Sequence, residues 1–501
     1  MDGARPWLAL APPPEHARRA GAAALAPPAE QLRLEFVHGV RAHGAREHLH
    51  VSASGELVFP CGSVAVVMAA GEEGADANAA GGARTPPPPS QRFYAQHGAE
   101  VLAIAMHPGG VLVATGEVSE RAAIHVWSSR SLSTEALLSG GQRDGVGALA
   151  FSPDGSLLAS ADVSAARTIA LWNWRAGTLL SLTRGGAGAV LGLAFSPRES
   201  SMVSYGQRHV RFWSRPLVGG GGGGGGGWTA RKGQFGAVGV QTVLCAAWLP
   251  GSGALVTGTS RGMVLEWGSA CEVVRSLRLH SQWPIFAIAA SAEGIAAGGR
   301  GGRLMLWPAD GSPADARAAR PVELGQLATS LTDEYGRLRC LLSGDAPCVR
   351  ALAFARGALL IVTRAGELWQ LGGSRPHCRL LLQGHAMLRT PAPTLGDGAR
   401  SELWGLAAHP LVPAIFATAG DDCTVRARRL FGAHTAWRAR ARASRPTLGP
   451  GSARPACATR ARDDDPPPRP LPSPSARRPR CPPPPMPPPP PSPPSHPPPP
   501  S

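Results

Sequence analysis

Few residue patterns in this chain could perform chemistry. The chain lacks the lysine-containing phosphate loop of nucleotide-binding proteins and the His-Glu-x-x-His pair of zinc proteases. The glycine-rich stretch 298–302 precedes no expected helix, so it lacks the helix N-terminus on which phosphate binding depends. The aspartates at 421–422 and 463–465 fall at a turn and in a Pro/Arg-rich segment, where solvated side chains are expected. We therefore predict no catalytic residue, no cofactor and no metal site, and a protein that is not an enzyme.

Composition narrows the class of protein further. The nine cysteines are scattered without a Cys-x-x-Cys pair, which argues against a zinc site. The N-terminus lacks the basic start and apolar stretch of a signal peptide, and no apolar run predicts a membrane span. The net charge of +16 is carried by arginine, since Lys232 is the only lysine. This arginine bias reflects either the composition of the source sequence or selection for binding to acidic partners. Because neither a signal peptide nor a membrane span is predicted, the expected location is the cytosol.

Short apolar strands that end in tryptophan recur along the middle of the chain, and these elements would have to position any functional residue. Five such markers lie 45, 41, 54 and 40 residues apart: Trp127, Trp172, Trp213, Trp267 and Trp307. A period of roughly 40–45 residues is typical of the four-stranded blades of a WD-repeat β-propeller. The long interval contains the glycines 219–227, which we expect to form a flexible excursion.

Two later units complete a count of about seven. Their markers are Trp369 and Trp404. By analogy with Trp213, a further tryptophan is due at position 428, but Arg428 stands there and the last blade is incomplete. We predict that all seven tryptophans are structural markers of the repeat. The first five are expected to fill the grooves between neighbouring blades, since an indole buries about 150–250 Å².

Two histidines, His97 and His385, follow the small-residue turns that open a unit. In WD repeats such a histidine joins a hydrogen-bonded set with a Ser or Thr, an Asp and the tryptophan. Most units here lack the turn aspartate, so we do not expect the complete set. The histidines that precede proline, His107 and His409, are expected at strand ends.

The remaining segments flank the repeats. We predict a disordered N-terminus at 1–30, a β segment at 31–68, a Gly/Ala/Pro loop at 69–90, the propeller at 91–430 and a tail at 431–501. The tail is rich in Arg and Pro, and its proline tracts would adopt an extended conformation. Either it is a disordered tail, or the reading frame departs from the coding sequence near residue 427.

The β segment and the repeats together resemble the echinoderm microtubule-associated protein-like family. The resemblance rests on Arg33-Leu-Glu-Phe-Val-His-Gly-Val40, on the repeats themselves and on Glu402-Leu-Trp-Gly-Leu-Ala-Ala-His-Pro410. The first stretch is similar to that family's HELP motif, here Leu34, Glu35, Phe36, Val37, His38 and Gly39. We call residues 31–68 the HELP-like segment.

The resemblance implies an all-β propeller that binds tubulin and microtubules and influences microtubule organisation or dynamics. The family carries two propellers in tandem and, in some members, an N-terminal coiled coil, whereas this sequence shows about seven units and no heptad pattern. The tubulin-contact residues are not indicated by any motif.

Two other functions stay open. The chain could be a general WD-repeat scaffold for protein complexes without microtubule binding. Alternatively, the arginine-rich tail could bind nucleic acid, which we consider less favoured because the tail has few aromatic side chains to stack on bases.

Overall fold

The computed structural model describes residues 34–42, 44, 46–69, 90–186, 188–198, 201–214, 228–280, 283–313, 315, 317–324, 348–372, 377–385, 403–412, 415–420 and 424–429. The expected tails at 1–30 and 431–501, most of the loop 69–90 and the glycine run 219–227 lie outside these residues. The chain divides into two compact units, Met1–Ala443 and Ser444–Ser501, and all described residues belong to the first. None of the helices among them is long and apolar enough to cross a lipid bilayer.

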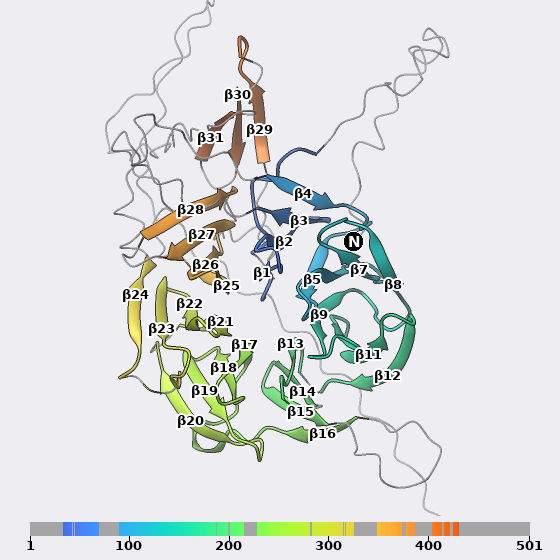
Figure 1. The fold of residues 1–501 in the computed structure, drawn as a ribbon, viewed down its shortest axis with the longest axis vertical. Helices are drawn as coiled ribbons and strands as arrows, with labels where there is room; N and C mark the ends of the chain where they lie inside the picture. The colour runs from blue at the N-terminus through green and yellow to red at the C-terminus, as the bar shows by residue number, and fades with distance from the viewer. Residues whose placement is uncertain are drawn as a thin grey trace, which may run out of the picture. The chain divides into compact units, whose positions relative to one another are not determined.

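The described strands form eight antiparallel sheets, seven of four strands and one of three (Figure 1). The first sheet comprises β1 His50–Val51, β2 Leu57–Cys61, β3 Val64–Met68 and β4 Gln91–Tyr94. The second comprises β5 Val101–Met106, β6 Leu112–Glu117, β7 Ile124–Ser128 and β8 Thr134–Leu138. The third comprises β9 Val146–Phe151, β10 Leu158–Asp162, β11 Thr168–Asn173 and β12 Thr178–Arg184.

The next four sheets repeat this pattern. The fourth comprises β13 Val190–Phe195, β14 Ser201–Gly206, β15 His209–Ser214 and β16 Thr229–Lys232, followed by the 3₁₀ helix η3 Gly236–Val238. The fifth comprises β17 Val243–Trp248, β18 Leu255–Thr259, β19 Met263–Trp267 and β20 Val273–Arg278. The sixth comprises β21 Ile285–Ser291, β22 Gly294–Gly299, β23 Arg303–Trp307 and β24 Arg320–Glu323. The seventh comprises β25 Val349–Ala355, β26 Ala358–Thr363, β27 Glu367–Gly372 and β28 His377–Gln383.

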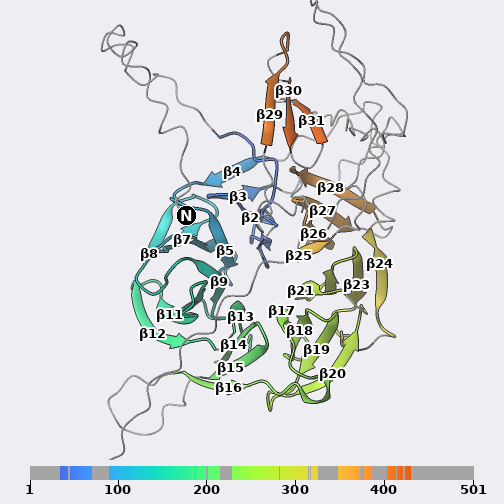
Figure 2. The ribbon, with the colours of Figure 1, turned by 180° about the vertical axis from the view of Figure 1, so that it is seen from behind.

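The first strand of each sheet lies next to the first strand of the following one. These inner strands pack in the order β5, β9, β13, β17, β21 and β25, and β1 contacts both β5 and β25, so the sheets close into a ring (Figures 1 and 2). The second strands are buried on both faces, as in β10 and β22. This double burial explains why their sequences are almost wholly small or apolar rather than alternating.

The predicted seven-bladed propeller is confirmed, and the HELP-like segment supplies one of its blades. One face of the β1–β4 sheet packs against the β25–β28 sheet through Phe59, Val66 and Leu360. The other face packs against the β5–β8 sheet through Ala65, Tyr94 and Trp127. Counting tryptophan units could not reveal this blade, because its third strand carries no tryptophan.

The unit expected to form the last blade lies outside the ring. Its strands are β29 Leu403–Ala408, β30 Ile415–Gly420 and β31 Thr424–Arg429. Position 428, where the repeat pattern called for tryptophan, lies in β31 with Arg428 opposite Phe416. Because the β1–β4 sheet already occupies the seventh place, this three-stranded sheet is not needed to close the ring.

Candidate functional site

The tryptophans that mark the repeats lie between the blades. In each of the six sheets from β5 to β28, the marker is buried and packs against the sheet that precedes its own: Trp127, Trp172, Trp213, Trp267, Trp307 and Trp369. Four of them donate their indole N–H to a hydroxyl on the second strand: Trp127 to Thr115 (3.1 Å), Trp172 to Ser160 (2.9 Å), Trp213 to Ser204 (2.9 Å) and Trp267 to Thr257 (2.9 Å). Trp404 is the second residue of β29, and its side chain is outside the described part of the chain.

The other two indoles find different acceptors. Ala297 stands where the hydroxyl would be in the β21–β24 sheet, and Trp307 donates instead to the backbone carbonyl of Asp315 (3.1 Å). In the β25–β28 sheet, the Glu367 carboxylate accepts from Trp369 (3.1 Å) and from Thr363 (3.1 Å). Every buried indole N–H among these six markers is therefore satisfied, which is what a structural role requires.

His97 does form a hydrogen-bonded set, in a variant form. Its Nε2 lies 2.7 Å from Thr115 Oγ1, which also accepts from Trp127, and its Nδ1 lies 3.1 Å from Glu117 Oε2. Glu117 thus takes the place of the missing turn aspartate. His385 makes the equivalent bond in the three-stranded sheet, with its Nε2 2.8 Å from Thr418 Oγ1.

The first HELP-like residues lie beside the β25–β28 sheet and β30. The ring of His38 lies 4.6 Å from that of Phe36 and 6.2 Å from that of Phe416, measured between centroids. Val37 is fixed to β4, because its N–H donates to the Gln91 side chain (2.7 Å) and its carbonyl accepts from it (3.1 Å). A Cβ on Gly384 would meet the His38 carbonyl at 2.5 Å, so only glycine fits where these two backbones meet. Gly39 lies beside Gly384 in the same crossing.

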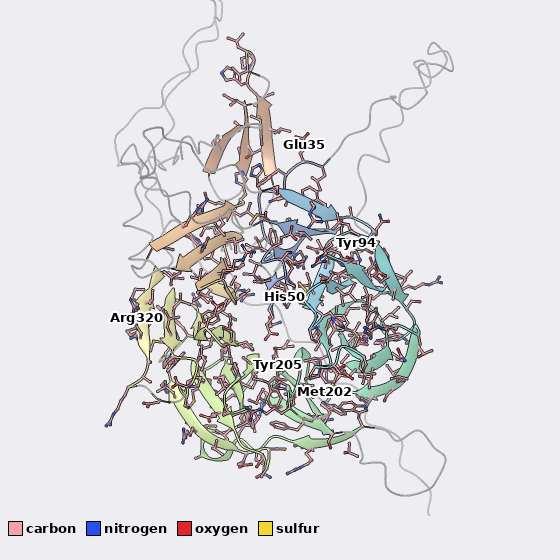
Figure 3. The ribbon with its side chains drawn as sticks, viewed as in Figure 1. Glu35, His50, Tyr94, Met202, Tyr205 and Arg320 are labelled. Atoms are coloured by element: carbon pink, nitrogen blue, oxygen red, sulfur yellow. The ribbon has the colours of Figure 1, made fainter. Side chains whose placement is uncertain are left out.

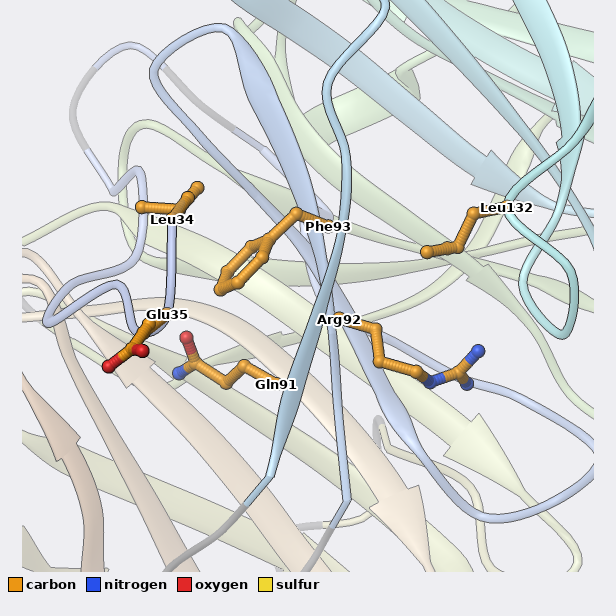
Figure 4. Close-up of a pocket in the computed structure, with 6 residues that line it drawn as sticks. All are labelled: Leu34, Glu35, Gln91, Arg92, Phe93 and Leu132. Atoms are coloured by element: carbon orange, nitrogen blue, oxygen red, sulfur yellow. The ribbon is translucent and has the colours of Figure 1, made fainter. Parts of the chain in front are cut away.

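Leu34 and Glu35 line a surface depression of about 390 Å³ with Gln91, Arg92, Phe93 and Leu132 (Figure 4). Two of its polar side chains are engaged within the fold: Gln91 bonds to the backbone of Val37, and Arg92 pairs with Glu56 at 2.8 Å. Arg92 also donates to the carbonyl of Arg130 (2.6 Å). These contacts fix the HELP-like segment against β4.

The HELP-like segment also enters the centre of the ring. Residues 46–48 lie beside the inner strands β5, β9 and β13, and together they line a cavity of about 20 Å³, the room of about one water molecule. Figure 3 shows His50 and Tyr205 near this centre. His50 Nε2 lies 3.2 Å from the carbonyl of Ile104, and Arg350 donates to the carbonyl of Ala42 (3.1 Å). The segment therefore contacts several blades at once.

Burial shifts the pKa of two titratable groups at this centre. Burial raises the pKa of Glu47, although hydrogen bonds from Tyr205 and Ala246 and the charge of Arg46 oppose the rise. Burial, together with the charge of Arg41, lowers the pKa of His48 to about 3. Both shifts favour the neutral form, as desolvation dictates.

One short motif escaped sequence reasoning. Residues 258–262 have the Gly-x-Ser-x-Gly spacing of a nucleophile elbow, with serine at Ser260. A nucleophile elbow needs a strand followed by a helix. Here Ser260 lies in the turn between the antiparallel strands β18 and β19. The match is therefore one of spacing only.

The outer strands of two neighbouring blades carry exposed positive charge. Strands β16 and β20 present Arg231, Lys232, Arg275 and Arg278, all exposed, and neither strand contains an acidic residue. The blades are joined there, because the N–H of Gln234 donates to the carbonyl of Cys271 (2.7 Å) and that of Val273 to the carbonyl of Gln234 (3.0 Å). We call these four side chains the basic rim.

Comparison with known families shows what this architecture resembles. Residues 90–369 match the model of the first β-propeller of echinoderm microtubule-associated proteins, and residues 27–66 match the HELP motif. The first match covers β4 to β26 and the start of β27, and the second covers β1, β2 and the start of β3.

Individual relatives agree with these family matches. Echinoderm microtubule-associated protein-like 2 of Mus musculus is 28% identical over 79% of this chain and 54% of its own length. Echinoderm microtubule-associated protein-like 3 of the same species is 30% identical over 79% of this chain and 42% of its own. The 77 kDa echinoderm microtubule-associated protein of Strongylocentrotus purpuratus is 25% identical over 79% and 51%. The chain thus spans about half the length of the curated relatives it matches.

Among solved structures, the β-propeller domain of Cps50 (Swd1) from Myceliophteria thermophila superimposes with a TM-score of 0.43 at 14% identity. That alignment covers 64% of this chain and 94% of the other.

Proposed function

Because the chain belongs to the echinoderm microtubule-associated protein-like family, we propose that it is a non-enzymatic cytoskeletal protein that binds tubulin in microtubules through its propeller. Its relatives are named for microtubule association. On this proposal the protein is located on the microtubule cytoskeleton and influences microtubule organisation or dynamics.

The basic rim is the surface of the propeller that we propose contacts the microtubule. Its four exposed cationic side chains lie on β16 and β20, the outer strands of neighbouring blades, which contain no acidic residue. The outer surface of a microtubule is acidic, so the two surfaces are complementary in charge. Complementary charges accelerate encounter and fix orientation, and their attraction weakens as salt rises.

The architecture supports a binding role. The tryptophans and their hydroxyl partners are buried between blades and satisfied within the fold. Residues 46–48 of the HELP-like segment lie against the inner strands β5, β9 and β13. The outer strands and turns are therefore the surfaces that a large partner could reach.

Co-sedimentation of the purified chain with polymerised microtubules tests this function. We expect the chain to pellet with microtubules at low salt and to be released as the salt concentration is raised. A chain that stays in the supernatant at low salt, while other proteins assemble on it, would support the alternative of a general WD-repeat scaffold.

A further inference from the structure

Three side chains that are far apart in the sequence converge next to the β1–β4 sheet. His97 lies in the turn before β5, Glu117 at the end of β6 and His125 on β7. One ligand atom from each lies within 4.8 Å of those of the other two. All three are buried, with exposed fractions of 7%, 8% and 9%. No short sequence motif connects them, so the sequence predicted no metal site here.

The hydrogen bonds around the cluster orient the two imidazoles toward the carboxylate. His97 uses Nε2 to contact Thr115 Oγ1 (2.7 Å), which leaves Nδ1 facing Glu117 Oε2 at 3.1 Å. His125 uses Nδ1 to contact the hydroxyl of Tyr94 (2.8 Å), and its Nε2 makes no hydrogen bond within the described part of the chain. Metal-binding histidines typically have this arrangement, in which one ring nitrogen is held by an outer hydrogen bond and the other is free to bind.

Within the described residues, the Glu117 carboxylate has no arginine or lysine partner, and besides His97 it accepts a hydrogen bond of 3.4 Å from the hydroxyl of Ser119. Among the ion pairs of the described residues, Glu117 pairs only with His97. A buried charge is costly unless it is paired or coordinates a metal.

We propose that His97 Nδ1, His125 Nε2 and the Glu117 carboxylate bind a divalent transition-metal ion of the zinc class, with water as a fourth ligand. Two imidazoles and one carboxylate are a common zinc donor set. With metal–ligand bonds of about 2.1 Å, tetrahedral ligands lie about 3.4 Å apart. Ligand atoms within 4.8 Å of one another reach that spacing through side-chain shifts of about 1 Å.

The position of the cluster gives the metal a structural effect. Tyr94 ends β4 of the β1–β4 sheet, contacts His125 and stacks on Trp127 with centroids 4.5 Å apart and planes 4° from parallel. The segment that carries His97 connects this sheet to β5. A bound ion would therefore strengthen the contact between the β1–β4 sheet and the β5–β8 sheet.

The neighbouring blade shows that the fold itself does not require these ligands. In the β9–β12 sheet, Gln142 takes the place of His97 and donates to Ser160 (2.6 Å), which also accepts from Trp172. Ala170 stands two residues before Trp172, as His125 stands two residues before Trp127. The substitutions His97→Gln and His125→Ala therefore copy a solution that the chain already uses, and both variants should fold.

Titration of the metal-free full-length chain with Co²⁺, followed by competition with Zn²⁺, tests the site. We expect one tightly bound equivalent with the visible absorption of tetrahedral cobalt, displaced by Zn²⁺, and an increase in the midpoint of thermal unfolding when Zn²⁺ is added. His97→Gln and His125→Ala should weaken binding at least tenfold and abolish the thermal shift, while their far-UV circular dichroism stays unchanged. His385→Gln, which alters the equivalent histidine outside the cluster, should bind as the wild type does.

Three results would overturn the proposal. The first is the absence of a tetrahedral cobalt spectrum from the wild-type chain. The second is binding by both cluster variants as tight as that of the wild type. The third is a loss of binding by His385→Gln equal to that of the cluster variants.

Discussion

The hydroxyl of Tyr205 donates a hydrogen bond of 2.7 Å to the carboxylate of Glu47, although 158 residues separate them in the sequence. Glu47 belongs to the HELP-like segment and Tyr205 to β14. The same carboxylate accepts from the N–H of Ala246 in β17 (3.3 Å). One side chain thus joins the segment at the centre of the ring to two blades far from the β1–β4 sheet.

Replacement of Glu47 tests this link. Because the folded state raises the pKa of Glu47, its contribution to stability is largest at low pH and is lost as the pH rises through the folded-state value. Glu47→Gln keeps an acceptor for Tyr205 without a charge, so we expect it to gain stability relative to the wild type between pH 5 and pH 8. Urea unfolding at both pH values measures this difference, and a pH-independent difference would contradict it.

Glu47→Ala serves as the companion variant. It removes the acceptor and leaves the buried hydroxyl of Tyr205 unpaired, which typically costs about 1–3 kcal/mol. We expect this loss at pH 5 as well as at pH 8. If Glu47→Ala were as stable as Glu47→Gln at both pH values, the hydrogen bond to Tyr205 would not contribute.

His48 should have the opposite pH dependence. Its pKa is lowered to about 3 in the folded state, so its contribution to stability is present above the ordinary value near 6.5 and is lost as the pH falls toward 3. We expect the wild type to lose about 1.4 kcal/mol per pH unit below 6.5 relative to His48→Gln. Chemical unfolding of both proteins between pH 7 and pH 4.5 measures the slope, and parallel curves would argue against a buried neutral His48.

Because the marker tryptophans are buried between blades, we expect their substitutions to lower the stability of the fold by an amount that depends on how much of the ring is lost. Trp172→Phe keeps most of the buried ring but loses the N–H bond to Ser160, so we expect a loss of about 1–3 kcal/mol. Trp172→Ala should lose about 3–5 kcal/mol. Trp283, which is 42% exposed, provides the control, and Trp283→Phe should stay within about 0.5 kcal/mol. Equal effects of Trp172→Phe and Trp283→Phe would contradict this role.

Because Gly384 lies close to the backbone of the HELP-like motif, a side chain at position 384 should clash and destabilise the fold. A Cβ on Gly384 would meet the His38 carbonyl oxygen at 2.5 Å, so Gly384→Ala should destabilise the chain by about 1–3 kcal/mol. Gly98 has no atom within 4 Å of its added Cβ, so Gly98→Ala should be nearly neutral. Thermal unfolding compares the two variants, and a neutral Gly384→Ala would show that this crossing is not tightly packed.

Much of the fold could be predicted because each blade has a local signature. Strands buried on both faces and a tryptophan at a regular interval identify six units, and the HELP-like strands are recognisable as strands. Their place in the ring could not be predicted, since it depends on packing between Phe59 and Leu360 and between Tyr94 and Trp127, which are distant in sequence. For the same reason, the sequence predicted the seventh blade in the unit from Gln383 to Arg426 instead of at the HELP-like segment.

The functional surfaces were less predictable than the fold. The Glu47–Tyr205 bond and the His97–Glu117–His125 cluster join residues that no short motif connects. The basic rim requires knowing that β16 and β20 adjoin, which depends on the backbone pairing of Gln234 with Cys271 and Val273. The tubulin-contact residues therefore remain a proposal.

The most direct test of the proposed function compares the microtubule affinity of a variant of the basic rim with that of a matched control variant. The rim variant combines Arg231→Glu, Lys232→Glu, Arg275→Glu and Arg278→Glu, and the control combines Arg121→Glu, Arg130→Glu, Arg143→Glu and Arg184→Glu, which are equally exposed but lie on other blades. Both variants change the net charge by the same amount. In co-sedimentation at low salt, we predict at least tenfold weaker binding for the rim variant and a change of less than about twofold for the control. Equal losses in the two variants, or unchanged binding by the rim variant, would contradict the proposal that the propeller binds microtubules through this surface.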